Sequence, residues 1–386
     1  MDSTIKIGVI GCGQRLLTVA RNLFQDNPLS LRLKITALYD PLPEAVETIR
    51  SEVAPDARSF PDVQSLLASD VDWVMVGSWN CFHADQIIAA LQAGKHVFAE
   101  KPLATTLEDC VRINEALKAA GDREFFFGLV LRYAPIYRKA KEILDSGVVG
   151  QIVSLEFNET LDFNHGGYIH GNWRRHRQRA GTHLLEKCCH DFDIVNWLLG
   201  SIPIRAASFG GLDIFRPDKK SLASDLKPNV EGRLPYRAWK DPEGVDPFSG
   251  GSSIVDNQVA ILQYASGARA TFHTNCHSAL PERRLYILGT KGAMRFDAAA
   301  STIEWKSIGF DTKAESISLG QNGMHFGADK VMAEHLARAM VGQAKSLATL
   351  HDGLTASVAC LGVDEALDRG EVIDLQPFWQ RAGVAV

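Results

Sequence analysis

The first third of the chain alternates short apolar runs with segments whose apolar residues recur at helical spacing. The apolar runs predict strands, and the amphipathic segments predict helices between them. The expected strands are 6–10, 35–39, 73–77, 96–99 and 125–129, and the expected helices are 14–24, 43–51, 63–67, 84–93 and 107–119. Continuously apolar strands separated by helices are typical of a parallel sheet covered on both faces. We therefore expect an α/β domain with a doubly wound parallel sheet over residues 1–128.

The pattern changes after Gly150, where apolar and polar residues begin to alternate. This alternation predicts strands at 151–159, 253–264, 268–275, 283–288 and 293–297, and helical spacing returns at 328–339 and 352–367. Residues 129–386 thus read as an α+β domain with a large, mostly antiparallel open sheet. Within it, 215–252 is rich in Pro, Gly, Asp and Lys and predicts a long loop insertion. We favour a solvated insertion there over a flap on a substrate pocket.

Composition narrows the class of protein. A chain of 386 residues with 46% hydrophobic and 23% charged residues suits a globular protein of two domains. A net charge of −5 predicts no nucleic-acid partner, and no apolar run approaches a membrane span. The first strand leaves no room for a signal peptide, so we expect a cytoplasmic protein. Seven scattered cysteines predict neither a disulfide framework nor a metal site, Cys188-Cys189-His190 included.

A glycine turn follows the first predicted strand, in the run Gly8-Val9-Ile10-Gly11-Cys12-Gly13. Such a turn lets backbone N–H groups and a helix N-terminus approach a pyrophosphate. The second strand ends at Asp40, whose carboxylate can accept hydrogen bonds from ribose hydroxyls and repels a 2′-phosphate, which favours NAD over NADP. The alternative is a turn aspartate, because a proline follows it. Leu16 occupies the third glycine position of the motif, so close helix–strand packing must arise differently.

Two further strands end in polar residues, at Ser78–His83 and at Glu100-Lys101-Pro102. Ligands bind at the carboxyl ends of parallel strands, so Lys101 is expected beside the nicotinamide. The expected cofactor-binding residues are Gly11, Cys12, Gly13, Gln14, Arg15, Asp40, Ser78, Asn80, His83, Glu100 and Lys101.

A second polar cluster lies on a predicted helix that Thr182 caps and that ends at Leu199. Its spacing places four residues on one face, namely Glu186, His190, Asp193 and Trp197. A carboxylate and an imidazole one turn apart can form a proton-transfer pair. A surface Glu–His pair or a core histidine bound to a backbone carbonyl is the alternative.

The segment 164–179, just before this helix, is rich in aromatic and hydrogen-bonding side chains, which suit a sugar or a cyclitol. It also holds four arginines, Arg174, Arg175, Arg177 and Arg179, which could bind a carboxylate, phosphate or sulfonate. A solvated basic loop at a subunit boundary is the alternative.

Several motifs, in their order along the chain, resemble those of the glucose–fructose oxidoreductase/inositol dehydrogenase (Gfo/Idh/MocA) family. They are Gly8–Gly13, Asn80-x-x-His83, Gly94–Val97 with Glu100-Lys101-Pro102, Gly128–Pro135, Trp173-Arg174, Glu186-x-x-x-His190-x-x-Asp193 and Arg283–Asp297. The resemblance implies a Rossmann domain followed by a substrate domain. It also implies NAD-dependent oxidation of a secondary hydroxyl or lactol of a sugar, cyclitol or sugar derivative.

The resemblance further implies catalytic roles for Lys101, Glu186 and His190. His190 would be the general base, Lys101 would polarise the developing alkoxide, and Glu186 would hold or tune His190. The expected substrate-binding residues are Lys101, Arg132, Tyr168, Trp173, Arg174, Glu186 and His190. Glu186 stands where the family commonly has aspartate, and Cys188 where it commonly has glycine, so the substrate pose can differ.

Two other functions remain compatible with this sequence. One is an NAD-dependent glycosidase that oxidises its sugar transiently. The other is a non-catalytic NAD-binding regulator, against which the presence of Lys101 and His190 speaks. We expect a homodimer or homotetramer, since an exposed face of the second sheet would suit self-association.

Overall fold

A computed structural model describes residues 4–239, 243–320 and 323–386, and the chain divides into two compact units. The first unit combines the residues up to Pro135 with the described residues from 323 to Ser357, and the second combines 136–320 with 358–386. The expected boundary was therefore wrong for 323–357, which were assigned to the second domain. These residues return to the first unit because α11 (Ala328–Met340) packs against α1 (Gln14–Phe24).

The first unit is built on a six-stranded parallel sheet with the order β3-β2-β1-β4-β5-β6. This is the strand order of a dinucleotide-binding doubly wound sheet. The predicted strands are confirmed to within two residues at each end. The short β3 was not predicted because its two residues are exposed and carry no apolar pattern. The strands are β1 (Ile5–Ile10), β2 (Leu33–Tyr39), β3 (Arg58–Ser59), β4 (Trp73–Val76), β5 (His96–Ala99) and β6 (Phe125–Phe127).

Helices connect these strands, and the expected ones are all present. Besides α1 and α11 they are α2 (Pro43–Val53), α3 (Val63–Leu67), α4 (His83–Gln92) and α5 (Leu107–Ala119). Short helical turns lie at η1 (Ser30–Arg32), η2 (Asn80–Phe82), η3 (Val130–Tyr133) and η7 (Met324–Gly327). A longer helix, α12 (Leu350–Arg369), begins in the first unit and ends in the second.

Leu16 and Gly77 together solve the packing problem left by the missing third glycine. Leu16 is buried on α1. A Cβ atom placed on Gly77 would lie 2.5 Å from the Cγ atom of Leu16. Atoms cannot approach that closely, so the leucine occupies the space that the glycine at the end of β4 leaves empty. The small residue needed for close helix–strand contact has moved from the helix to the neighbouring strand.

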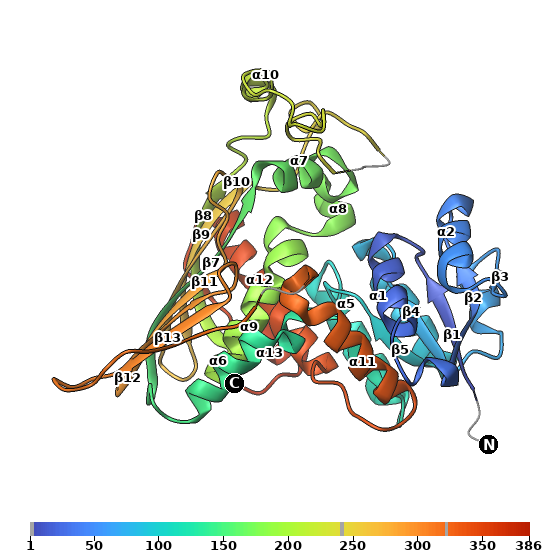
Figure 1. Ribbon diagram of the computed structural model, residues 1–386, viewed down its shortest axis with the longest axis horizontal. Helices are drawn as coiled ribbons and strands as arrows, with labels where there is room; N and C mark the ends of the chain where they lie inside the picture. Colours follow the sequence, from blue (N-terminus) through green and yellow to red (C-terminus); the bar gives the residue numbers. More distant parts are fainter. Residues whose placement is uncertain (1–3, 240–242, 321–322) are drawn as a thin grey trace. The chain divides into compact units, whose positions relative to one another are not determined.

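The second unit contains a nine-stranded sheet with the order β14-β13-β12-β11-β7-β10-β9-β8-β15 (Figure 1). Its strand pairs are antiparallel except for β7 and β10, which run parallel. This confirms the expected mostly antiparallel open sheet. The strands are β7 (Ile152–Asp162), β8 (Pro203–Gly211), β9 (Asn257–Tyr264), β10 (Arg269–Ser278), β11 (Arg284–Gly289), β12 (Gly292–Asp297), β13 (Thr302–Ser307), β14 (Glu315–Ser318) and β15 (Ile373–Asp374).

Helices of this unit lie along one face of the sheet (Figure 1). Leu155 and Phe157 of β7 are buried on the helix-covered side, and alternate residues such as Glu156 are exposed. The helices are α6 (Pro135–Asp145), α7 (Phe163–Gly171), α8 (Arg177–Ala180), the π-helix η5 (Leu184–Cys188), α9 (Cys189–Leu199), α10 (Ser221–Ser224) and α13 (Gln376–Ala382), with turns η4 (Trp173–Arg175) and η6 (Pro217–Lys219).

The segment 215–252 is more than the solvated insertion that we favoured. Phe215, Tyr236 and Phe248 are buried in a cluster with Leu161 and Ile169 of the flanking elements. Their rings contact each other at centroid distances of 5.0–6.1 Å. The aromatic residues are irregularly spaced, so no periodicity signalled this small core. Residues 240–242 of the segment lie outside the described residues.

Candidate active site

The two glycines of the first turn have different structural roles. Gly11 has a φ of +87°, donates its N–H to the Tyr39 carbonyl at 2.9 Å, and would collide with the Ser78 backbone if it carried a Cβ atom. It is therefore required for loop packing. Gly13 is the N-cap of α1, and the space where its Cβ would stand is open. Together with the exposed Gln14, this leaves a helix N-terminus accessible to an anion.

Asp40 ties the end of β2 to the glycine turn. Its carboxylate accepts N–H groups from Cys12 at 2.7 Å and Leu42 at 2.9 Å. Burial raises the pKa of Asp40, and the two N–H donors oppose that shift. The turn role considered as an alternative is thus present. A carboxylate has about four acceptor positions, so the group retains capacity for ribose hydroxyls.

Arg15 links three parts of the first unit. Its Nε donates to Glu100 Oε1 at 2.7 Å, and its Nη1 donates to Asp329 Oδ1 at 2.5 Å. Its Nη2 is buried, and none of the described residues accepts a hydrogen bond from it. A buried donor without an acceptor beside an open helix N-terminus fits the phosphates of a dinucleotide.

His83 joins the two loops that carry the other candidate residues. Its Nδ1 lies 2.8 Å from the Pro102 carbonyl oxygen and its Nε2 lies 3.1 Å from that of Ser78. Burial lowers the pKa of His83, and the two carbonyl oxygens oppose that shift. We infer a positioning role for this histidine, since both ring nitrogens face the protein. Lys101 directly precedes Pro102 in the second of these loops. It is half-buried, and its backbone N–H lies 3.3 Å from Glu100 Oε2.

Arg132, an expected substrate-binding residue, has partners within the first unit. Its side chain is buried, pairs with Asp352 Oδ1 at 2.8 Å and donates to the Leu347 carbonyl at 3.2 Å. Both partners belong to the returning segment of the first unit. The arginine therefore fastens that segment, and its expected role in substrate binding stays a prediction.

The helix predicted between Thr182 and Leu199 begins as expected, but its first turns are wound differently. Thr182 accepts the N–H of Leu185 at 3.0 Å, which confirms the predicted cap. Residues 184–188 then form a π-helix instead of an α-helix. A π-helix bonds each residue to the fifth one along, so Glu186 is not simply one α-helical turn before His190. Such turns are frequent at functional sites.

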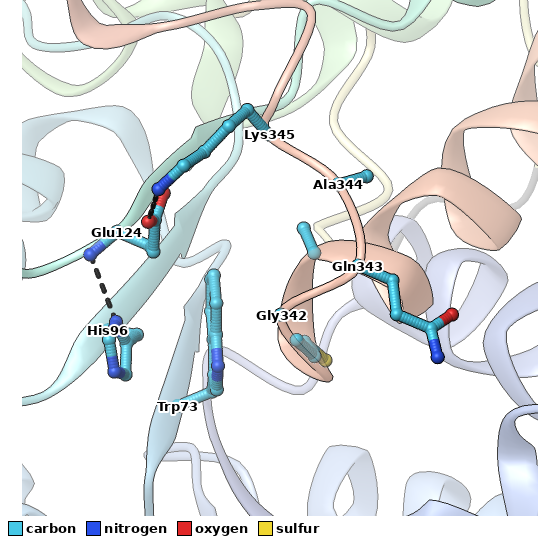
Figure 2. A pocket seen from close by; sticks show the side chains of 9 residues that line it. Trp73, His96, Glu124, Gly342, Gln343, Ala344 and Lys345 are labelled. Atoms are coloured by element: carbon cyan, nitrogen blue, oxygen red, sulfur yellow. Dashed lines mark hydrogen bonds and ion pairs between the residues drawn. The ribbon is translucent and has the colours of Figure 1, made fainter.

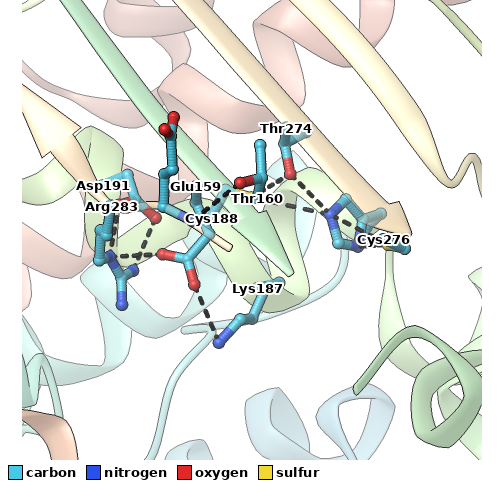
Figure 3. A network of polar contacts seen from close by, with 10 residues as sticks. Glu159, Thr160, Lys187, Cys188, Asp191, Thr274, Cys276 and Arg283 are labelled. Carbon is cyan, nitrogen blue, oxygen red and sulfur yellow. Dashed lines mark hydrogen bonds and ion pairs between the residues drawn. The ribbon is translucent and has the colours of Figure 1, made fainter. Parts of the chain in front are cut away.

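A buried network of charges anchors this helix to the sheet (Figure 3). Lys187 Nζ lies 3.2 Å from Glu159 Oε1, and Arg283 binds both that glutamate and Asp191, the latter through two hydrogen bonds of 2.7 and 2.8 Å. Burial raises the pKa of Asp191, whereas Arg283 and Lys187 outweigh burial at Glu159 and lower its pKa. Since 187 and 191 directly follow 186 and 190, the network fixes the backbone that carries both predicted catalytic residues.

Glu186 and His190 are both buried, at 8% and 5% exposure. The Glu186 carboxylate accepts a hydrogen bond from Arg174 Nε at 3.0 Å, and Arg174 Nη1 donates to the Tyr168 hydroxyl at 3.0 Å. The guanidinium carbon also lies 4.5 Å from the Trp173 ring centroid. Three predicted substrate-binding residues are thus assembled around Glu186. A direct role of Glu186 in tuning His190 stays a prediction.

The other arginines of this segment also have carboxylate partners. Arg175 pairs with Glu243 at 2.6 Å, and Arg179 lies 3.5 Å from the same carboxylate. Arg177 forms a two-point ion pair with Asp368. Three carboxylates of the second unit thus compensate most of the positive charge of the four arginines in 174–179.

Two hollows in the first unit lie away from the candidate residues. The larger, of about 420 Å³, is lined by Trp73, His96, Glu124 and residues 339–345 (Figure 2), and the other, of about 330 Å³, shares Trp73 and His96. Trp73 and His96 are the first residues of β4 and β5, whereas Ser78 and Glu100 follow the ends of these strands. The hollows thus lie at the amino ends of these strands, whereas the glycine turn follows the carboxyl end of β1.

Across 4–239, 243–320 and 323–386, no helix has the length and apolar character that a bilayer span requires. In the same ranges, no three His, Cys, Asp or Glu side chains are grouped as metal ligands would be.

The sheet order and the open glycine turn define the first unit as a dinucleotide-binding domain. Residues 5–128 match the oxidoreductase family with an NAD-binding Rossmann fold, and residues 137–295 match the GFO/IDH/MocA C-terminal domain. The chain belongs to the Gfo/Idh/MocA family of NAD(P)-dependent oxidoreductases.

Individual relatives cover different shares of the chain. It is 29% identical over 295 residues to the 2,7-anhydro-N-acetylneuraminate hydratase of Escherichia coli K12, covering 76% of this chain and 68% of that protein. It is 34% identical over 198 residues to an inositol 2-dehydrogenase of Burkholderia multivorans, covering 51% and 55%. A solved levoglucosan dehydrogenase, in complex with NADH and levoglucosan, superimposes with a TM-score of 0.77 at 17% identity, covering 97% and 100%, and shares the fold.

Sequence reasoning missed the residues that hold the site in place. Lys187 and Asp191 stand in a helical segment with many buried residues, which is the signal that buried partners exist. Their partner Glu159 lies on β7, and their partner Arg283 directly precedes β11. Only the structure brings the four residues together.

Proposed function

We propose that this protein is an NAD-dependent dehydrogenase of an uncharged sugar, cyclitol or glycoside. The observation that carries the proposal is the Glu186–Arg174–Tyr168 cluster, whose glutamate shares with His190 a helical segment anchored by buried charges. Hydrogen-bonding groups among aromatic rings suit a polyhydroxylated ligand. The family membership and its inositol and levoglucosan dehydrogenases support the same substrate class.

We assign the cofactor as NAD because of Asp40 and Arg15. A carboxylate at the end of β2 opposes a 2′-phosphate. Arg15, a cation of the glycine turn, is already compensated by Glu100 and Asp329. When bound, NAD supplies the two-electron acceptor, C4 of the nicotinamide, for the hydrogen leaving the substrate carbon.

In the proposed reaction the residues of this chain move one proton and stabilise one charge. His190 takes the hydroxyl proton as the substrate C–H bond breaks and the carbonyl forms. Lys101 donates a hydrogen bond to the same oxygen and stabilises the negative charge that develops on it. Arg174 holds the Glu186 carboxylate in one orientation through Nε. Glu186 can then bind a substrate hydroxyl or stabilise the protonated imidazole.

An anionic substrate is disfavoured by the arginine pairing. The four arginines that suggested it face three carboxylates at 2.5–3.5 Å, with Arg175 and Arg179 sharing Glu243. An added acid would have to displace one of these partners, at the cost of breaking an existing ion pair.

A spectrophotometric panel tests the proposal. NAD and NADP are each supplied with inositols, hexoses, glycosides and the matching sugar acids, and reduced cofactor is followed. We expect turnover with NAD and neutral substrates. Preference for NADP would overturn the Asp40 assignment, and preference for a sugar acid would overturn the charge argument.

A reaction without net oxidation is the second candidate, favoured by the similarity to a hydratase. The same residues would oxidise the sugar transiently, allow elimination and addition of water, and return the hydrogen. Formation of a hydrated or hydrolysed product without accumulation of NADH would select it.

We also propose a homodimer or larger homo-oligomer through the open face of the second sheet. Phe209 lies opposite Val259 in the β8–β9 register, and Ile261 lies two residues further along the same face. All three are exposed. Analytical ultracentrifugation of Phe209→Glu with Ile261→Glu should show dissociation, and an unchanged mass would contradict the assignment.

A further inference from the structure

The segment 215–252 presents one tryptophan to the candidate active site of the second unit. Tyr236 anchors the segment: it is buried, and its hydroxyl lies 2.7 Å from His277 Nε2. Trp239 follows three residues later and is 43% exposed. Its ring contacts His165 at 4.4 Å and Tyr168 at 5.2 Å, both on α7. The indole is therefore held by two rings while part of its surface stays open.

Trp239 is connected to the predicted catalytic residues through side chains in contact. The Tyr168 ring touches it, the Tyr168 hydroxyl accepts from Arg174, and Arg174 donates to Glu186. Two side chains thus separate the indole from Glu186. A sugar ring that binds at Glu186 can therefore be joined to a second ring that stacks on Trp239.

The chemistry of this surface fits a neutral sugar ring. Aromatic rings bury the C–H faces of a ligand, and polar groups at their edges bind its hydroxyls. Here the polar groups are the Tyr168 hydroxyl, the Arg174 guanidinium and the His165 imidazole. The guanidinium is compensated by Glu186, and burial holds the pKa of His165 well below its usual range, so the surface carries no net charge.

We propose that Trp239 is a stacking platform for a second sugar ring, joined to the ring that is oxidised. The inference rests on the proposed function and extends it: the preferred substrate is a glycoside or short oligosaccharide. Trp239 then determines specificity as part of the substrate site.

The test compares Trp239→Ala, Trp239→Phe and Val230→Ala with the wild type. Val230 is a fully exposed residue of the same segment and serves as the control. The probes are cellobiose, maltose and lactose against glucose and galactose. Trp239→Ala should raise KM for a disaccharide about tenfold and change kcat/KM for its monosaccharide less than about twofold. Trp239→Phe should keep most of the disaccharide preference, and Val230→Ala should match the wild type.

Equal losses on both sugar classes, or no loss on disaccharides, would overturn the proposal. Calorimetric binding of the same disaccharides separates it from the proposed function. Binding that depends on Trp239 without any NAD reduction would support the platform and refute the dehydrogenase. A changed oligomeric state in Trp239→Ala with unchanged disaccharide binding would assign the tryptophan to a contact with a second copy and refute the platform.

Discussion

Exchanging the small residue between Leu16 and Gly77 tests how the first unit packs its helix against its sheet. In Gly77→Ala, the new methyl carbon would lie 2.5, 2.9 and 3.0 Å from three carbons of Leu16. All three distances are too short for carbon atoms, and Leu16 is buried with little room to move. Overpacking of this kind typically costs about 1–3 kcal/mol of folding free energy.

A double-mutant cycle isolates the contact. Leu16→Ala alone should destabilise by about 2–5 kcal/mol because it leaves a cavity. In the Leu16→Ala background the methyl group added by Gly77→Ala fills part of that cavity, so the second substitution should then cost little. The predicted coupling between the two sites is about 1–3 kcal/mol.

Equilibrium urea unfolding of the four proteins measures the free energies, and titration with NAD reports whether the glycine turn has moved. We expect Gly77→Ala alone to weaken NAD binding, and we expect the double variant with Leu16→Ala to recover part of it. Additive free energies, with the same cost of Gly77→Ala in both backgrounds, would refute the packing argument.

Two further predictions concern buried charges of the second unit. Asp364 is buried against Thr182 and Gln258, and burial raises its pKa to about 7, above about 3.9 in the unfolded chain. The folded state therefore binds the proton more tightly, so the stability that Asp364 contributes is complete below about pH 4 and is lost as pH rises through 7. In Asp364→Asn the free energy of unfolding should depend less steeply on pH. An unchanged slope would contradict this. Arg283→Met strands the carboxylates of Glu159 and Asp191 and should cost about 3–5 kcal/mol in urea unfolding, whereas Arg295→Met, at an exposed ion pair, should cost less than about 1 kcal/mol. Equal effects of the two arginine substitutions would show that the buried network does not anchor the helix.

Much of the fold could be predicted because burial leaves a clear pattern. The strands β1, β4 and β5 are apolar throughout most of their length since helices cover both faces of their sheet. The second sheet was only partly predicted, because β13 and β14 near its edge have exposed polar residues and little alternation. The return of 323–357 to the first unit depends on contacts such as Arg132–Asp352, which no local pattern encodes.

The sequence suggested residues for the candidate site but not their partners. Motif spacing pointed to Lys101, Glu186 and His190, whose catalytic roles stay predictions. It could not show that Arg174 holds Glu186, because a run of arginines reads equally well as an anion site. Nor could helical periodicity reveal the π-helix at 184–188, since that winding results from the surrounding packing.

The most direct test of the account is the kinetics of His190→Ala on a substrate that the wild type oxidises with NAD. A general base is typically worth a factor of about 10²–10⁴ in rate. We predict that turnover falls by about that factor while the calorimetric Kd for NAD stays within about twofold of the wild type. Full turnover in His190→Ala would contradict the proposed proton transfer and, with it, the assignment of this helix as the active site.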